Sequence, residues 1–345
     1  MSGIAFPGQA ILELTYNCNN QCKFCYCPWE NTAKPELRFE KHEELSLDSW
    51  KRALSVLERI GVKRVGLSGG EPLLKDCFPD LLRHIRQNTS LNKGKKISVI
   101  SNGLLMNEQL LSLFKEMGVH LQLSLPGLTT YEWHTGSDNA ATVLHWLRRA
   151  KAKGVTTTAN VIVSRRNIHE LYETVANAVL AGADTIMLNR VLIGGRGIGY
   201  MDELSLSRAE IREMVDVTEK VLETSGSVGA VGTEIPLCVL DEDKLDKYEY
   251  LRVGGLCAAA RGFFVIDPSG YVRACNHSPR RLGHILEDEI IADIEYWNLF
   301  SGRAYGLPEM CDSCRLVNQC DCGCREAAAI CYGSLDEPDP SMVNI

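Results

Sequence analysis

The residues of this sequence best suited to chemistry are three cysteines near its start, Cys18, Cys22 and Cys25. Their spacing, C-x3-C-x2-C, puts three thiols on one short loop, and thiolates on such a loop can ligate one iron–sulfur cluster. A cubane takes four ligands, so three thiolates leave one iron open to another molecule. Structural zinc is the alternative, although zinc sites usually begin with a C-x2-C or C-x4-C pair. Cys27 could add a thiolate, but its C-x-C spacing is awkward for the same cluster.

A second group of cysteines lies near the other end, where eight of the fourteen fall between residues 257 and 331. The pattern C-x12-G-x4-C is followed by C-x2-C-x5-C-x3-C and one more cysteine, which gives Cys257, Cys275, Cys311, Cys314, Cys320, Cys324 and Cys331. A pair of zinc ribbons is the alternative interpretation of these spacings. Clustered cysteines in a chain without a secretion signal bind metal or do redox chemistry more often than they form disulfides.

Composition excludes several classes of function. The formal net charge is −7 and no long basic run interrupts the sequence, so the basic footprint that sequence-independent nucleic-acid binding needs is not visible in it. No apolar run approaches the ~18–20 residues of a membrane-spanning helix. The N-terminal sequence lacks the basic and then apolar regions of a signal peptide. We therefore expect a cytoplasmic protein with no nucleic-acid or membrane partner.

The cysteine loop must be positioned by the elements around it, and the first two-thirds of the chain alternates short apolar runs with amphipathic segments. Amphipathic segments around residues 50–60, 139–153 and 168–179 have helical spacing and are each followed by glycine. Six strand–helix units in a row imply a parallel sheet with helices outside it. The expected strands are Ala10–Leu14, Arg64–Leu67, Ile97–Ile100, His120–Leu125, Thr157–Val163 and Thr185–Leu188.

The hydrophobic pattern of the sequence changes after one more expected helix, at about 206–223. Periodicity becomes weak, and Asp-Pro-Ser-Gly at 267–270 predicts a turn between two hairpin strands. We therefore predict a domain boundary near residue 224, with one domain over 1–224 and a second, cysteine-rich domain over 225–345.

The N-terminal motifs resemble those of radical S-adenosylmethionine (SAM) enzymes. The resemblance rests on two segments, CNNQCKFC at 18–25 and Ser-Gly-Gly-Glu-Pro at 68–72. It implies an α/β fold, a partial (β/α)6 TIM-like barrel whose site lies at the carboxyl ends of the strands. It also implies a [4Fe–4S] cluster on Cys18, Cys22 and Cys25. The implied SAM contacts are Gly69, Gly70, Glu71, Pro72, Ser101, Asn102 and Ser124, with Asn160 or Ser164 on the fifth strand.

The C-terminal pattern resembles the SPASM domain, an extension of radical SAM enzymes that carries auxiliary clusters. The resemblance implies one [4Fe–4S] cluster on Cys257, Cys275 and Cys324, for which Cys238 is the candidate fourth ligand. Without Cys238, that cluster would have an open iron. The second auxiliary cluster would be held by Cys311, Cys314, Cys320 and Cys331. Three [4Fe–4S] clusters are therefore expected in all.

This family implies reductive cleavage of SAM to a 5′-deoxyadenosyl radical, which abstracts a hydrogen atom from the substrate. Auxiliary clusters would accept the remaining electron, so the expected outcome is oxidative modification or cross-linking of a ribosomally synthesised peptide or a protein side chain. His277 is a candidate proton acceptor, and a hydrogen bond to its own loop is the alternative role. Expected partners are a reductase, such as flavodoxin or ferredoxin, and a separate leader-peptide-binding protein.

Three alternatives to peptide cross-linking follow from the same residues. Sulfatase-maturing relatives carry an aspartate where this chain has Asn276, which disfavours that branch. A small-molecule or tetrapyrrole substrate is the second alternative. A non-catalytic iron–sulfur electron carrier is the third, but it would need neither the Gly-Gly-Glu-Pro motif nor an open cluster.

Overall fold

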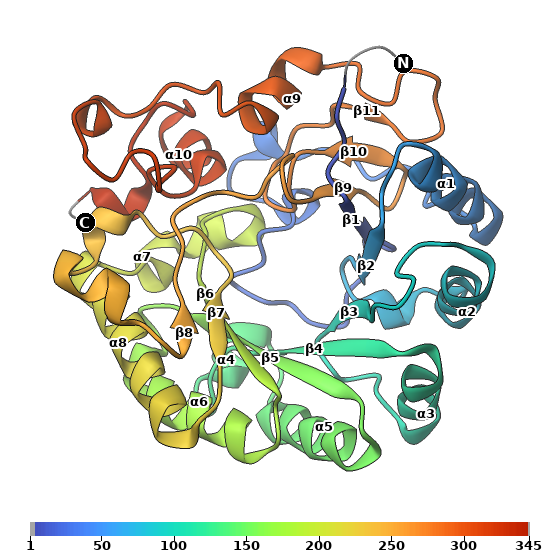
Figure 1. Cartoon of the computed structure of the whole chain (residues 1–345), viewed down its shortest axis with the longest axis horizontal. Coiled ribbons are helices and arrows are strands. Elements are labelled where there is room, and N and C mark those ends of the chain that lie inside the picture. The colour runs from blue at the N-terminus through green and yellow to red at the C-terminus, as the bar shows by residue number, and fades with distance from the viewer. Residues whose placement is uncertain (1–3, 344–345) are drawn as a thin grey trace.

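Eleven strands form one sheet in the computed structural model, which describes residues 4–343. The order of the strands is β11-β10-β9-β1-β2-β3-β4-β5-β6-β7-β8. The sheet curves so that its helices lie on the outside, as Figure 1 shows. The strands are β1 (Gln9–Glu13), β2 (Arg64–Ser68), β3 (Ile97–Ser101), β4 (Val119–Leu125), β5 (Thr156–Val163), β6 (Thr185–Arg190), β7 (Gly229–Val231), β8 (Leu251–Arg252), β9 (Phe264–Ile266), β10 (Tyr271–Arg273) and β11 (Gly283–His284).

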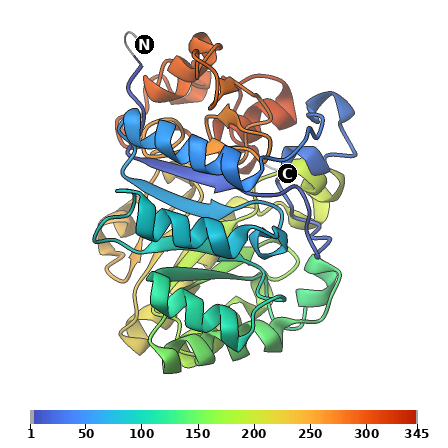
Figure 2. The ribbon, with the colours of Figure 1, turned by 90° about the vertical axis from the view of Figure 1, so that its right-hand side faces the viewer.

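The first six strands are parallel neighbours, and a helix connects each to the next. Figure 2 shows the first three of these helices stacked along one side of the sheet. The predicted parallel α/β fold is confirmed, and each predicted strand lies within two residues of an observed one. The helices are α1 (Leu47–Arg59), α2 (Phe78–Asn88), α3 (Glu108–Met117), α4 (Tyr131–Thr135), α5 (Ala140–Lys153), α6 (Leu171–Leu180), α7 (Met201–Leu204), α8 (Arg208–Ser225), α9 (Ile294–Ser301) and α10 (Arg325–Tyr332).

Burial alternates along the strands, so one series of side chains packs under the helices and the other faces the inside of the barrel. In β4, every second residue beginning with Val119 is fully buried, and the residues between them are half-buried. The buried series, Leu121, Leu123 and Leu125, belongs to the main hydrophobic core, which also includes the apolar faces of the helices. The half-buried series includes Gln122 and Ser124 and lines the inside of the barrel. Polar residues that point inward are therefore available to a ligand.

The C-terminal segment extends the same sheet at both edges. Strand β9 pairs in parallel with β1, and β10 and β11 continue from it as antiparallel hairpins. Strands β7 and β8 extend the opposite edge beyond β6. The predicted hairpin around 267–270 is present, whereas the very short strands β7, β8 and β11 had no sequence signal. The proposed division at residue 224 stays a prediction.

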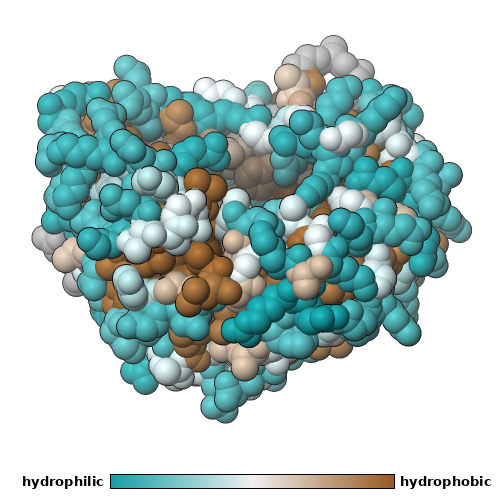
Figure 3. Space-filling model, turned by 60° about the horizontal axis from the view of Figure 1, so that its bottom comes forward, coloured by the Kyte–Doolittle hydropathy of each residue, from teal (hydrophilic) through white to brown (hydrophobic). Residues whose placement is uncertain are grey.

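The face of the molecule seen in Figure 3 is predominantly polar. In the view of Figure 3, hydrophilic residues cover most of the face, and hydrophobic residues form a smaller patch near its centre. Within residues 4–343, no helix combines the length and the apolar character needed to cross a membrane.

Candidate active site

A cavity of about 360 Å³ opens at the carboxyl ends of the first strands, where the loop after β1 meets the turns after β2, β3 and β4. The three N-terminal cysteines all line it. So do most of the residues that the sequence predicted for SAM: the cavity wall includes Cys18, Cys22, Cys25, Gly69, Gly70, Glu71, Ser101, Asn102 and Ser124. The structure therefore brings together residues that are more than a hundred positions apart in sequence. Pro72 is buried beside this wall, at the start of a short 3-10 turn.

The thiols of Cys18, Cys22 and Cys25 lie close enough to affect one another's ionisation. Burial, together with the nearby Glu71 and Cys25, raises the pKa of Cys18 to about 11. Burial and the other two thiols also raise the pKa of Cys22. A hydrogen bond with Cys27 instead lowers the pKa of Cys25. A bound metal cation would supply the positive charge that the ionised thiols of Cys18 and Cys22 lack. Over residues 4–343, no three His, Cys, Asp or Glu side chains converge on a position for a single metal ion.

The Gly-Gly-Glu turn after β2 is hydrogen-bonded to the start of the cysteine loop. Gly70 N donates to Thr15 O over 2.7 Å, and Glu71 N donates to Asn17 O over 2.8 Å. A Cβ atom on Gly70 would lie 2.2 Å from Asn17 O, which no side chain can tolerate. The glycines were expected to admit a ligand. In the structure, the space beside Gly70 is occupied by the backbone of the cysteine loop at Asn17.

Glu71 is a buried carboxylate, 1% exposed, at the base of the cavity. Its oxygens accept hydrogen bonds from Ser101 Oγ (2.9 Å), Asn102 N (2.8 Å) and Leu73 N (3.2 Å). Burial outweighs these bonds and raises the pKa of Glu71 to about 7. A carboxylate held in this way would be stabilised by a cationic ligand such as an ammonium group.

The polar residues on or just after β3, β4 and β5 differ in whether their side chains already have hydrogen-bond partners. Asn102 Nδ2 donates to Asn19 Oδ1 over 2.7 Å and lies 3.9 Å from Cys18 Sγ, so it contacts the cysteine loop directly. Ser124 lines the cavity, and its register partner on β5, Asn160, is buried with no hydrogen-bond partner for Oδ1. Ser164 is instead bonded to His134 Nε2 over 2.8 Å.

A glycine-rich loop after β6 also supports the cysteine loop, a role that was not predicted from the sequence. Arg196 lines the cavity, where Nη1 donates to Cys22 O (3.1 Å) and Nη2 pairs with Glu30 Oε2 (2.5 Å). Gly195 has φ +50°, and a Cβ there would lie 2.5 Å from the carbonyl oxygens of Cys25 and Cys27. The run Gly194-Gly195-Arg196-Gly197 was the available signal, since clustered glycines after a strand permit close backbone approach.

The C-terminal cysteines divide into two sets. Burial raises the pKa of Cys257, and the nearby Glu234, Cys275 and Cys324 raise it further by their charge. The amides of Ala259 and Ala327 donate to Cys257 Sγ and Cys324 Sγ, both over 3.4 Å. This set matches the one expected for the first auxiliary cluster.

The second set gathers around Cys320, whose Sγ accepts hydrogen bonds from Leu237 N (3.4 Å) and Cys322 N (3.3 Å). Cys311 and Cys322 belong to one small buried cluster. The structure does not bring Cys331 to this set. Its side chain packs on α10 against a different apolar cluster, which consists of Val191, Ile193 and Leu204.

His277 lies at the first C-terminal set rather than in the wall of the cavity. Its Nε2 faces Ile193 O at 2.8 Å, and its Nδ1 is 3.7 Å from Cys324 Sγ. Burial lowers the pKa of His277 to about 4, so the ring is a weaker proton acceptor than a free imidazole.

A buried carboxylate that no sequence motif predicted connects β1 with the region around Cys275. Glu13, at the end of β1, forms an ion pair with Arg273 and accepts a hydrogen bond from Asn276 Nδ2 over 2.9 Å. The Arg273 guanidinium also donates to the carbonyl oxygen of Ser278 over 2.8 Å. Glu13 had no sequence signal, because a lone glutamate within a strand does not reveal its partner 260 residues later.

Comparisons with known proteins show which family this chain is similar to. Residues 12–178 match the model of the Radical SAM superfamily. A protein named PqqA peptide cyclase from Rhodopseudomonas palustris is 28% identical, and the match covers 97% of this chain and 86% of that protein. A protein of the same name from Xanthomonas campestris is 27% identical over 99% of this chain and 88% of its own.

Two solved structures share the fold. Streptococcus suis SuiB bound to its precursor peptide SuiA has a TM-score of 0.74 and 16% identity, and the match covers 99% of this chain and 76% of that one. Native anSMEcpe with bound AdoMet and a Cp18Cys peptide has a TM-score of 0.70 and 17% identity, over 97% and 94% of the two chains. The predicted fold is confirmed by both. The motif-based prediction is confirmed as well: the chain is a radical SAM enzyme, which uses a [4Fe–4S] cluster and SAM, with a cysteine-rich C-terminal region.

Proposed function

We propose that this enzyme carries out an oxidative modification or cross-link on a ribosomally synthesised peptide. The observation that supports it most is the single cavity in which the three cysteines of one loop meet the Gly-Gly-Glu turn. The relatives that align along nearly the whole chain are named as peptide cyclases, and two of the structures with the same fold contain a bound peptide. These relatives favour a peptide over a small-molecule or tetrapyrrole substrate.

Each group of cavity residues has a separate role in the proposal. Cys18, Cys22 and Cys25 hold the [4Fe–4S] cluster, and Glu71 accepts the ammonium group of SAM. With both cofactors bound, one-electron cleavage of SAM supplies the radical that abstracts hydrogen from the substrate. Asn102 ties the turn after β3 to the cysteine loop and so fixes the distance between the two binding sites. Arg196 holds the cysteine loop from the opposite side.

Two auxiliary [4Fe–4S] clusters in the C-terminal region would make three clusters in all. The first would use Cys257, Cys275 and Cys324, and the second would use Cys311, Cys314 and Cys320. They would accept the electron released when the substrate radical is oxidised. A reductase such as flavodoxin or ferredoxin, a separate leader-peptide-binding protein and a cytoplasmic location complete the proposal, since such clusters require a reducing compartment.

Radical formation is tested with the anaerobically reconstituted, reduced protein and SAM, by measuring 5′-deoxyadenosine chromatographically. The variant with Cys18, Cys22 and Cys25 all replaced by Ala should lose this product completely while it retains auxiliary iron. Cys77→Ala is the matched control, because Cys77 lies at the start of α2, outside the cavity wall. Product formation by the triple variant would overturn the assignment of this loop.

Peptide modification is tested by mass spectrometry of short peptides encoded beside the gene. The expected result is a mass loss of two hydrogens per modification, together with 5′-deoxyadenosine. Cleavage of SAM without any change in these peptides, but with change in a tetrapyrrole, would favour the alternative substrate class.

A further inference from the structure

Tyr26 is an exposed aromatic side chain in the wall of the cavity that contains the three N-terminal cysteines. Of the other aromatic residues in this wall, three are buried and one is half-buried: Tyr16, Trp29 and Tyr131, and Phe24. Tyr26 itself is 38% exposed. Ligands in pockets pack on apolar and aromatic side chains that remain accessible to them. Tyr26 therefore offers its ring to a molecule that enters the cavity beside SAM.

The backbone at Tyr26 is held in place, although its side chain is exposed. A Cβ atom on Gly195 would lie 2.7 Å from Tyr26 C, so the glycine-rich loop after β6 packs directly against this backbone. In the chain that follows, Cys27 and Trp29 are buried together in one small apolar cluster. A contact residue that is already fixed before binding loses less conformational freedom when a ligand arrives. Tyr26 is therefore pre-organised as a contact surface.

Tyr26 also faces the C-terminal part of the chain. Tyr26 and His277 together line a second cavity, with a volume of about 10 Å³. The centroids of their rings are 6.3 Å apart in an edge-to-face arrangement. His277 Nδ1 in turn lies 3.7 Å from Cys324 Sγ. Tyr26 therefore lies between the cavity proposed for SAM and the first C-terminal cysteine set.

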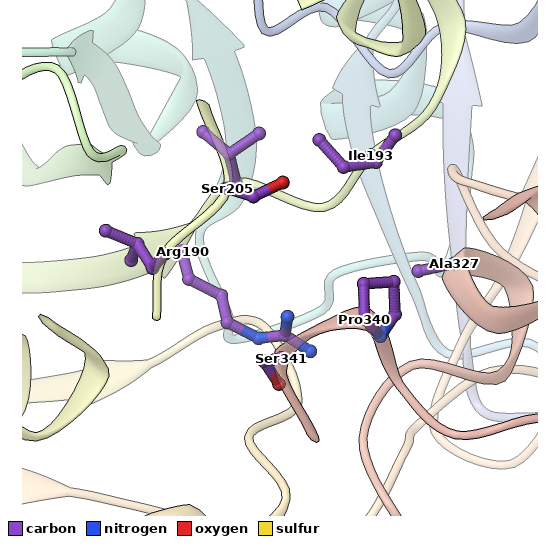
Figure 4. A pocket seen from close by; sticks show the side chains of 8 residues that line it. Arg190, Ile193, Ser205, Ala327, Pro340 and Ser341 are labelled. Carbon is purple, nitrogen blue, oxygen red and sulfur yellow. The ribbon is translucent and has the colours of Figure 1, made fainter. Parts of the chain in front are cut away.

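The volumes of the cavities decide where a peptide side chain can fit. The cavity between Tyr26 and His277 has room for about one water molecule. A third cavity, which Figure 4 shows between Arg190, Ser205 and Ser341, has the same volume of about 10 Å³. Neither can hold a side chain, whereas the cavity of about 360 Å³ at the cysteine loop can. A peptide side chain that approaches both SAM and the C-terminal set therefore enters the large cavity, where the Tyr26 ring is exposed.

We propose that the ring of Tyr26 is the surface on which the reacting side chain of the peptide substrate packs. The inference rests on the proposed function, because it takes a peptide as the substrate, and it adds the residue that recognises this peptide inside the cavity. Contact with the ring favours an apolar or aromatic side chain at the reacting position, since stacked and edge-to-face contacts bury apolar surface. The contact also holds that side chain on the side of the cavity that faces the first C-terminal set.

The test measures peptide binding separately from turnover. The probe is the peptide encoded beside the gene that the wild type modifies in the mass-spectrometric assay, carrying a fluorescent label at one end. Its binding to the anaerobically reconstituted full chain is followed by fluorescence anisotropy, with SAM present and without reductant, so that no radical forms. Calorimetric titration with SAM, iron analysis and circular dichroism of every variant report on the SAM site, the clusters and the fold.

Substitutions that remove or keep the ring give the decisive comparison. Tyr26→Leu should weaken the binding of this peptide about tenfold or more, because it removes an aromatic ring at the centre of the contact. Tyr26→Phe keeps the ring and should restore the affinity. Tyr26→Met tests the same loss with an unbranched side chain, in case leucine disturbs the cysteine loop. Tyr172→Leu is the matched control, because Tyr172 is also exposed but lies on α6, outside the cavity wall.

The contrary outcomes separate the inference from the function on which it rests. Wild-type affinity for the peptide in Tyr26→Leu or Tyr26→Met, with full iron content, would overturn the inference and leave peptide modification in place. An equal loss of SAM affinity in these variants would also overturn it, since Tyr26 would then be a contact of SAM. A wild type that cleaves SAM but modifies none of the peptides would overturn the proposed function and this inference together.

Discussion

At the scale of single residues, the most informative side chain is Glu71. Its oxygens accept three hydrogen bonds, yet burial raises its pKa to about 7, so the ionised form lacks a positive partner. An ammonium group at this position would supply it. We expect Glu71→Gln to weaken SAM binding about tenfold to a hundredfold, the equivalent of ~1.5–3 kcal/mol for a hydrogen bond to a charged group. Calorimetric titration of the anaerobic protein with SAM measures this, and unchanged affinity would contradict the role of Glu71.

The pKa of Glu71 also predicts a pH dependence. Between the ordinary glutamate value of 4.5 and about 7, the folded state holds a proton that the unfolded state has lost. The folded state therefore loses stability from this group as the pH rises through that window. SAM favours the ionised form, so its affinity should rise over the same window. Titrations about one pH unit on either side of 7 should show this rise in the wild type but not in Glu71→Gln.

At the scale of elements, the loop after β6 determines whether the cysteine loop keeps its shape. Gly195 has φ +50°, and a Cβ there would meet two carbonyl oxygens of the cysteine loop at 2.5 Å. We expect Gly195→Ala to cost more than the ~1–2 kcal/mol of the left-handed backbone alone and to impair assembly of the SAM-binding cluster. Gly199→Ala in the same 3-10 turn is the control, because its Cβ would meet nothing closer than 4.0 Å. Equal iron content and 5′-deoxyadenosine yield in both variants would contradict this role.

Sequence periodicity predicted the longer elements, in which buried apolar residues recur regularly, and missed the shortest strands. The six parallel strands and the helices between them follow from apolar spacing, as in β4. Strands β8 and β11 contain only two residues each, too few for any period to show. The cysteine loop and Glu71 were identified because each lies in a short, contiguous motif that resembles those of radical SAM enzymes. Glu13, Arg196 and the position of Cys331 depend on partners far away in the sequence, which spacing alone cannot reveal.

At the scale of the whole molecule, a buried ion pair joins β1, near the start of the chain, to β10 in its C-terminal part. Arg273 is fully buried and pairs with Glu13, which is 2% exposed. Replacement of one member of such a pair leaves an uncompensated buried charge and costs about 3–5 kcal/mol. We therefore expect Arg273→Leu to lower the free energy of unfolding in urea by this amount. Arg83→Leu, which removes an exposed pair with Asp80, should change it by only about 0–1 kcal/mol. Similar losses in the two variants would contradict the importance of the buried pair.

The continuous sheet also predicts how the molecule unfolds. The sequence suggested two domains divided near residue 224, but β9 pairs with β1 through Ala10, Ile11 and Leu12, and Arg273 lies on the strand beyond. A chain that ends at residue 224 would expose this edge of β1, and exposed apolar strand edges promote aggregation. It would also leave the Glu13 carboxylate without its partner.

We therefore expect the full chain to unfold in one transition by circular dichroism and by tryptophan fluorescence, because Trp297 in the C-terminal part and Trp50 in the N-terminal part belong to one core. The fragment 1–224 should elute as aggregates in gel filtration and fail to bind SAM. The full chain in the same buffer is the control. A monomeric fragment with its own cooperative transition would show instead that the N-terminal part folds without β9, and that the pairing across β1 only joins two independent domains.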